Sequence, residues 1–285
     1  MATTSGNLAE NKGFAAVRMR PVVVDHDILS IEKADFCESF ALVMEDLDKH
    51  LRKFQKDQDE DQVHDLRIAL RRAQAHVRLL PKGVRKQDTT LKFSESRKEA
   101  TRLCSRLRDL DVIVARTKGL LSTPRQNLLL ADLRERRRAL LKKAEKSARR
   151  LRDASLTEDL GEKVGRRQLE RRFKSVVSEL VEDINRSASF IFEDETNEGE
   201  LHNLRVGCKK LRYTLEAAGN DKKRENVLKT LELWSDTLGE VHDWDVVRAY
   251  LRDRAPQSKD LIHAATQRRK QKYEGFRAAS QLSMP

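Results

Sequence analysis

Aromatic side chains are scarce in this sequence, whose 285 residues include only 9 Phe, 3 Tyr and 2 Trp. Proteins that bind single-stranded nucleic acid stack the bases on exposed rings, so the sequence is poorly equipped for that mode of binding. A run of about 20 apolar residues, which a membrane-spanning helix needs, does not occur. The first residues also lack the apolar stretch of a signal peptide, and we expect a soluble, intracellular protein without membrane association.

Cysteine is scarce as well, with only Cys37, Cys104 and Cys208. Their odd number and wide spacing match neither a disulfide framework nor a zinc site of the CxxC type. We therefore expect three reduced thiols, no metal site and no cofactor.

Proline and glycine are few, at 5 and 11 residues, and long windows are rich in Leu, Ala, Glu, Lys and Arg. This composition predicts an all-α fold. The prolines and glycines mark the breaks between helices, and residues 1–26 have the character of a loose tail. The eight helices predicted in this way cover residues 28–56, 60–80, 85–118, 124–155, 166–193, 199–218, 222–253 and 257–282.

The sequence contains an internal repeat. Residues 63–80 align without a gap on residues 201–218, and both follow the pattern H-x-L-R-[IV]-x-x-[RK]-[RK]. A second pair follows downstream, where residues 107–115 and 241–249 share x-x-D-x-D-V. Two four-helix units with the same internal order explain this spacing most simply.

Each copy of the repeated helix carries a basic stripe beside its apolar face, at about 100° per residue. A single basic stripe is usually only a solvated surface, but two copies could form one continuous surface on which like charges repel until an anion neutralises them. The net charge of +12 also favours an anionic partner. We therefore predict that the stripes bind a polyanion through Arg and Lys donors to phosphate oxygens. The stripes consist of His64, Arg67, Arg71 and Arg78 in the first copy and His202, Arg205, Lys209 and Arg212 in the second.

The two copies differ in charge at two positions. Glu216 stands at the position of Arg78, and His242 stands at the position of Arg108. The first half therefore contributes more positive charge at these points.

Several other residues have two interpretations. The His64-Asp65 and His242-Asp243 pairs superficially resemble metal-dependent phosphohydrolases of the HD type, although the further His and Asp ligands of such a site are missing. The aspartates of the second motif could bind a divalent ion, but beside so many arginines we expect them to orient Arg side chains instead. These aspartates are Asp109, Asp111, Asp243 and Asp245.

Three aromatic residues and two basic clusters also need an interpretation. We expect Trp234, Trp244 and Tyr213 to be packing residues. The basic clusters at 136–138 and 268–270 would either widen the positive surface or remain solvated helix surface.

The repeated motifs resemble the CHAD family, the conserved-histidine α-helical domain. The likeness rests on HDLRIALRR (64–72) with LRDLDV (107–112), and on HNLRVGCKKLRYTLE (202–216) with LGEVHDWDV (238–246). It implies two four-helix bundles related by a pseudo-twofold axis, which we assign to residues 27–156 and 165–285. It also implies a basic surface or pore that binds inorganic polyphosphate.

The resemblance and the stripes together give the expected site. Many family members are fused to a triphosphate-tunnel domain with an ExExK signature, and its absence here favours a binding module over an enzyme. The alternatives are non-specific, weak nucleic-acid binding and, less favoured, a metal-dependent phosphohydrolase. Association with polyphosphate-containing granules or nucleic-acid-rich regions would fit the family. The expected polyphosphate-binding residues are His64, Arg67, Arg71, Arg72, Arg78, Arg108, Arg138, His202, Arg205, Lys209, Lys210, Arg212, Tyr213 and His242.

Overall fold

A computed structural model describes residues 22–118, 120, 124–156, 162–191, 196–219 and 221–282. Over these residues the chain forms α-helices and two short 3-10 turns, and no β-strand, which confirms the all-α prediction. The elements are η1 (His26–Ile28), α1 (Lys33–Lys56), α2 (Glu60–Leu79), α3 (Lys82–Arg85), α4 (Asp88–Lys118), α5 (Pro124–Asp153), α6 (Arg166–Ile191), α7 (Glu198–Glu216), η2 (Lys222–Arg224), α8 (Glu225–Arg254) and α9 (Lys259–Leu282).

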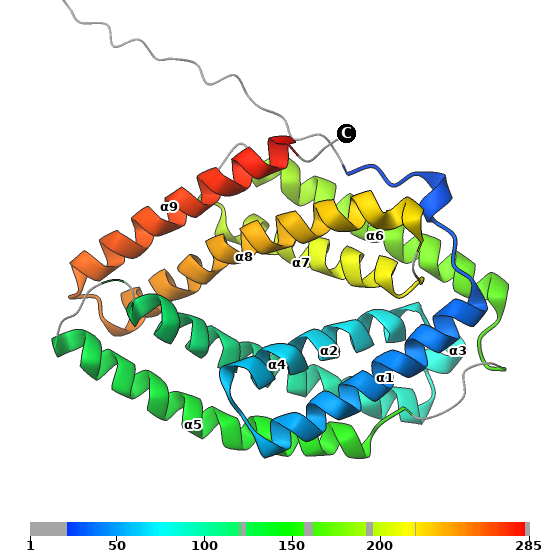
Figure 1. The fold of residues 1–285 in the computed structure, drawn as a ribbon, viewed down its shortest axis with the longest axis horizontal. Coiled ribbons are helices and arrows are strands. Elements are labelled where there is room, and N and C mark those ends of the chain that lie inside the picture. The colour runs from blue at the N-terminus through cyan, green and yellow to red at the C-terminus, as the bar shows by residue number, and fades with distance from the viewer. Residues whose placement is uncertain are drawn as a thin grey trace, which may run out of the picture.

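The long helices form two groups that lie one above the other in Figure 1. In the first group α1 packs on α2 and α5, while α4 packs on α2 and α5. In the second group α6, α7, α8 and α9 pack in succession. The groups meet where α2 contacts α7 and α4 contacts α8, so the two repeated helices face each other.

All eight predicted helices are present, and the largest difference lies at the first one. It begins at Lys33 instead of residue 28. The guanidinium group of Arg224, which is buried, donates hydrogen bonds to the carbonyl oxygens of Ile28 and Ser30. These carbonyl oxygens therefore accept hydrogen bonds from a distant side chain, and the backbone around them does not continue the helix. The break predicted at Pro81 contains the short helix α3.

The two repeated helices begin in the same way. The side chain of Asp59 accepts a hydrogen bond from the backbone N–H of Gln62 at the start of α2, at 2.7 Å. Asn197, at the matching position of the repeat, accepts one from Glu200 at the start of α7, at 3.1 Å. Both residues satisfy N–H groups that have no partner within the helix, and these caps fix where the basic stripes begin.

The hydrophobic core joins the two groups of helices. Its larger cluster includes Phe36 and Leu70 from the first group and Phe173 and Trp234 from the second, all fully buried. A smaller cluster, the Trp244 cluster, packs α4 and α5 against α8 and α9. The expected packing roles of Trp234, Trp244 and Tyr213 are confirmed, since all three side chains are buried. The Trp244 cluster contains Ile113, Val114, Leu130, Leu133, Trp244, Val247, Leu251, Ala255, Leu261 and Ala265.

The expected N-terminal tail lies mostly outside the described residues, which begin at Val22. Val22 exchanges two hydrogen bonds with the side-chain amide of Asn185 in α6, at 2.7 and 3.1 Å. The three cysteines form no disulfide. Of the helices within the described ranges, none is long and apolar enough to cross a membrane.

Candidate anion-binding site

Four basic residues of the repeated helices face one another between the two groups of helices. Arg67 and Arg71 lie on α2, and Arg205 and Lys209 lie on α7. Their charges interact across the interface, since Arg71 and Arg67 both lower the pKa of Lys209, and Arg67 lowers the pKa of Arg205. We call these four residues the central cations. The structure thus brings the middle of the two predicted stripes together.

The central cations lack the ion pairs that usually accompany buried charges. None of them forms an ion pair with a carboxylate of the described residues. Arg67 donates a hydrogen bond to the hydroxyl oxygen of Ser105 at 3.3 Å. Arg205 is only 4% exposed, and its buried Nε has no hydrogen-bond partner. The site therefore holds positive charge that the described protein atoms do not neutralise.

Burial and mutual repulsion lower the pKa values of these side chains. Burial, followed by Arg205 and then Arg71, lowers the pKa of Lys209 to about 7. Burial is also the main cause that lowers the pKa of Arg67 and of Arg205 to about 10. An anion within the site would reverse both effects, because it would offset the lost hydration and the repulsion.

Three histidines surround the central cations. The rings of His202 on α7 and His242 on α8 lie 5.2 Å apart between centroids. Burial and the charge of Arg205 lower the pKa of His202 and bring that of His242 to about 3. Burial and the charge of Arg108 likewise lower the pKa of His64. All three rings are therefore mainly neutral at pH 7 and can donate or accept hydrogen bonds without adding charge.

The aspartates of the second motif mostly pair with arginines, as expected. Asp111 accepts a hydrogen bond from Arg137 at 2.5 Å, and Asp245 accepts one from Arg269 at 2.8 Å. These pairs occupy matching positions in the two halves. Asp243 pairs with Arg116 on α4 at 3.1 Å.

Three carboxylates interact electrostatically with the central cations without forming ion pairs with them. Asp243 and Asp109 oppose the lowering of the pKa of Arg205, Asp109 opposes it for Arg67, and Asp236 opposes it for Lys209. Burial raises the pKa of Asp109 itself. Burial and repulsion outweigh these attractions, since the pKa values of Arg67, Arg205 and Lys209 remain lowered. Within the described ranges, no group of three His, Cys, Asp or Glu residues could hold a metal ion.

A cavity of about 170 Å³ lies between α2, α4 and α7, next to the central cations. Five of the predicted site residues line it, and Gln74, Thr101 and Thr214 add polar groups. Tyr213 is buried in its wall, and its hydroxyl accepts a hydrogen bond from Arg212 at 3.3 Å. The predicted residues that line the cavity are Arg71, Arg78, Lys209, Lys210 and Tyr213.

Three other predicted site residues are paired with carboxylates. Arg72 lies 3.7 Å from Glu216, and Arg212 contacts Glu232 at 2.9 Å and Glu216 at 3.6 Å. Arg78 contacts Glu179 of α6 at 3.2 Å. The stripes therefore divide into an unpaired middle, the central cations, and paired ends.

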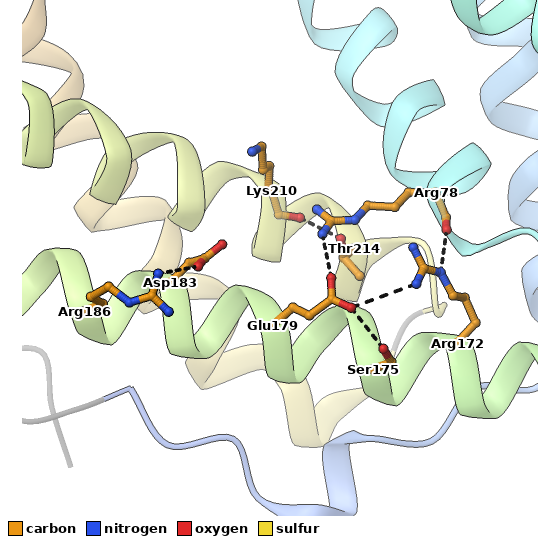
Figure 2. A network of polar contacts seen from close by, with 8 residues as sticks. All are labelled: Arg78, Arg172, Ser175, Glu179, Asp183, Arg186, Lys210 and Thr214. Atoms are coloured by element: carbon orange, nitrogen blue, oxygen red, sulfur yellow. Dashed lines mark hydrogen bonds and ion pairs between the residues drawn. The ribbon is translucent and has the colours of Figure 1, made fainter.

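Figure 2 shows the pairing of Arg78. Its side chain reaches from α2 toward α6, where Glu179 also contacts Arg172 and accepts a hydrogen bond from Ser175. Arg172 in turn donates to the backbone carbonyl of Arg78. This network joins the two groups of helices at one end of the site. It also offsets part of the charge difference expected from Glu216, because Arg78 contacts the carboxylate of Glu179, which it shares with Arg172.

The remaining predicted residue, Arg138, is exposed on α5, and its charge does not contribute to the pKa shifts of the central cations. Nearby Arg137 and, in the second half, Arg269 are held in ion pairs with Asp111 and Asp245. For these two arginines neither expected role applies, because their side chains are largely buried and paired with carboxylates.

The sequence did not predict the carboxylates that form ion pairs with Arg78 and Arg212. Glu179 and Glu232 come from α6 and α8 and lie outside the repeated motifs. Ser105 is the exception, because it occupies the position of Gly239 in the repeat and this difference is visible in the alignment.

Comparison with known proteins places these observations in context. The sequence profile of the CHAD domain matches residues 38–252. The crystal structure of the CHAD domain from the plant Ricinus communis superposes with a TM-score of 0.60 at 18% sequence identity. The superposition covers 95% of this chain and 98% of that chain, so the likeness extends over the whole fold. No curated protein matches the sequence.

Proposed function

The chain belongs to the CHAD domain family, and from this starting point we propose that it binds inorganic polyphosphate through the central cations. One observation carries the proposal: four cations from two facing helices, Arg205 buried and the other three half-buried, lie beside a cavity that Arg71 and Lys209 line, and none has a carboxylate partner among the described residues. Such an arrangement is unfavourable in the free protein and becomes favourable when an anion enters.

The geometry favours a thin anion with many oxygens. The cavity of about 170 Å³ is too small for a nucleic-acid duplex but can take a chain of phosphate groups. Of the central cations that line this cavity, Arg71 can present a forked donor to phosphate oxygens and Lys209 can add a point charge, while Arg67 and Arg205 add positive charge next to it. The neutral His202 and His242 can complete the hydrogen bonding.

The proposal requires binding without a chemical step. The histidines that could act as bases lie among arginines. Asp243, next to His242, is engaged by Arg116, and Asp111 and Asp245 are engaged by Arg137 and Arg269. We therefore propose a binding module and no enzymatic activity. Phosphate release from polyphosphate in the presence of Mg²⁺ or Mn²⁺, lost on replacing His64 and His202 by Ala, would contradict this.

A titration with long-chain polyphosphate over a salt series tests the proposal. Replacing all four central cations by Gln should abolish binding without loss of helical signal, because it removes the unneutralised charge. The matched control is Arg72→Gln with Arg212→Gln, which removes paired cations from the same helices and should weaken binding far less. Unchanged affinity in the folded fourfold variant would overturn the proposal.

Competition separates polyphosphate from other phosphate ligands. Duplex DNA at an equal phosphate concentration should not displace polyphosphate from the central cations. Displacement would mean that the site recognises charge alone, as non-specific nucleic-acid binding does.

A further inference from the structure

Helix α5 holds most of the chain's excess positive charge. Its 30 residues contain 11 Lys and Arg against 4 Asp and Glu, an excess of seven out of the total of twelve. It lies on the outside of the first group of helices, packed against α4 and α1. The central cations are on other helices, so most of this charge does not belong to the site described above.

Five basic residues on α5 follow one another at intervals of four. All five side chains are exposed, and the row that they form is about 24 Å long at 1.5 Å per residue. Like charges at this spacing are neighbours on a helix and destabilise it. We call them the α5 row: Arg134, Arg138, Lys142, Lys146 and Arg150.

Two of the four carboxylates of α5 are paired with arginines outside the row. Asp132 pairs with Arg136 at 2.6 Å, and Glu145 pairs with Arg149 at 2.5 Å. No residue of the α5 row forms an ion pair with a carboxylate in the described part of the chain. Even Glu99, whose pKa Arg150 helps to lower, is held by Arg102 at 2.7 Å. The positive charges of the α5 row are therefore available to an external anion.

The second half of the chain shows that the fold does not require this row. The pairs Arg137–Asp111 and Arg269–Asp245 align α5 with α9. In that alignment the first four positions of the row correspond to one cation, one carboxylate and two uncharged residues. They are Thr266, Lys270, Glu274 and Ala278.

The surroundings of the row favour one kind of polyanion. The exposed side chains of the α5 row can contact a broad phosphate backbone, whereas the central cations lie beside a small cavity. Among the large apolar side chains described as exposed, Phe190 on α6 is the single aromatic one, so the row has no platform for stacking unpaired bases. We propose that the α5 row binds the phosphate backbone of duplex nucleic acid, independently of base sequence and separately from the central cations.

The test measures binding of a short DNA duplex and of long-chain polyphosphate to the full-length protein over a salt series. The row variant carries Lys142→Gln, Lys146→Gln and Arg150→Gln. Losing three phosphate contacts should weaken duplex binding and make the slope of log K against log salt shallower by roughly 2.7. Polyphosphate affinity should not change. The fourfold central-cation variant should show the reverse behaviour, which separates failure of this inference from failure of the proposed function.

A matched control removes the same charge elsewhere. Arg167→Gln, Arg171→Gln and Lys174→Gln alter exposed residues of α6 and should leave duplex binding nearly intact. The inference is overturned if the α6 variant weakens duplex binding as much as the row variant, because net charge would then explain it. It is also overturned if the row variant binds duplex normally, if it loses polyphosphate and DNA together, or if single-stranded DNA binds as tightly as the duplex.

Discussion

The imidazole rings of His202 and His242 lie 5.2 Å apart and are tilted by 50°, one on α7 and the other on α8. Because burial lowers the pKa of both, this pair is uncharged at neutral pH. The charge of the site comes instead from Arg67, Arg71, Arg205 and, in a pH-dependent way, Lys209.

We predict that polyphosphate binding takes up protons near pH 8. The pKa of Lys209 is lowered to about 7 by burial and by Arg205, Arg71 and Arg67, with Asp236 acting in the opposite direction. Lys209 is therefore mostly neutral at pH 8 in the free protein, and a bound anion raises its pKa. Affinity should fall as pH rises above 7, by up to about tenfold per pH unit.

Calorimetry in two buffers with different ionisation enthalpies measures this uptake. The control is Lys209→Arg, which keeps the charge at all these pH values and should remove most of the uptake. Equal proton uptake by the two proteins would show that Lys209 is not the group that titrates.

The same group affects the stability of the free protein. An unfolded Lys209 keeps its proton up to its ordinary pKa of 10.5, whereas the folded protein releases it above about 7. The unfolded state then binds more protons between these values, so this contribution to the free energy of unfolding rises from pH 7 toward 10.5. In Lys209→Met that rise should be smaller, as urea unfolding at several pH values would show; an unchanged rise would assign it to other groups.

We predict that Arg205→Met stabilises the free protein while weakening polyphosphate binding. Arg205 is almost fully buried and its Nε has no partner, so removal of this donor should raise the free energy of unfolding by about 1–3 kcal/mol. Denaturant unfolding checks the first effect and a polyphosphate titration the second. Loss of stability would mean that Arg205 holds Asp109 in place more strongly than it repels Arg67.

We predict that Asp111→Ala destabilises the fold but leaves polyphosphate affinity nearly unchanged. Asp111 is 1% exposed and pairs with Arg137, so the variant leaves a mostly buried cation without a partner, at a cost of about 3 kcal/mol. Restored stability in Asp111→Ala with Arg137→Met would confirm the cause. If Asp111→Ala instead abolished binding in a folded protein, Asp111 would belong to the site.

We predict opposite effects for two glycines. In Gly207→Ala the new methyl group would lie 2.9 Å from the Ile184 side chain at the contact of α6 and α7, and the overpacking should cost about 1–3 kcal/mol. In Gly239→Ala on α8 nothing lies within 4 Å, so better helix propensity should stabilise the fold by up to about 1 kcal/mol. Thermal unfolding of both variants checks the prediction, and a stabilising Gly207→Ala would contradict the close packing of α6 on α7.

The sequence was sufficient to predict the helices and the two stripes, because helical periodicity and a gapless repeat are local features. It could not predict where the first helix begins, since that depends on hydrogen bonds from Arg224, about 200 residues away, to the Ile28 and Ser30 carbonyls. Such a contact between distant segments leaves no local pattern.

The sequence also could not predict which cations of the stripes form ion pairs with carboxylates. Arg71 and Arg78 belong to the same predicted stripe on α2. Arg71 has no carboxylate partner among the described residues, whereas Arg78 forms an ion pair with Glu179 of α6. Helix periodicity gives the face on which a cation lies. Whether it is neutralised depends on how α6 and α8 pack against that face.

The Trp244 cluster has a consequence for how the protein unfolds. It takes Ile113 and Leu133 from the first group of helices and Trp244 and Leu251 from the second, so separating the groups would expose these side chains to water. Neither half can therefore melt while the other keeps a complete core, and heat or urea should unfold the chain in one cooperative transition. The chain thus contains two sequence repeats but should unfold as one cooperative unit.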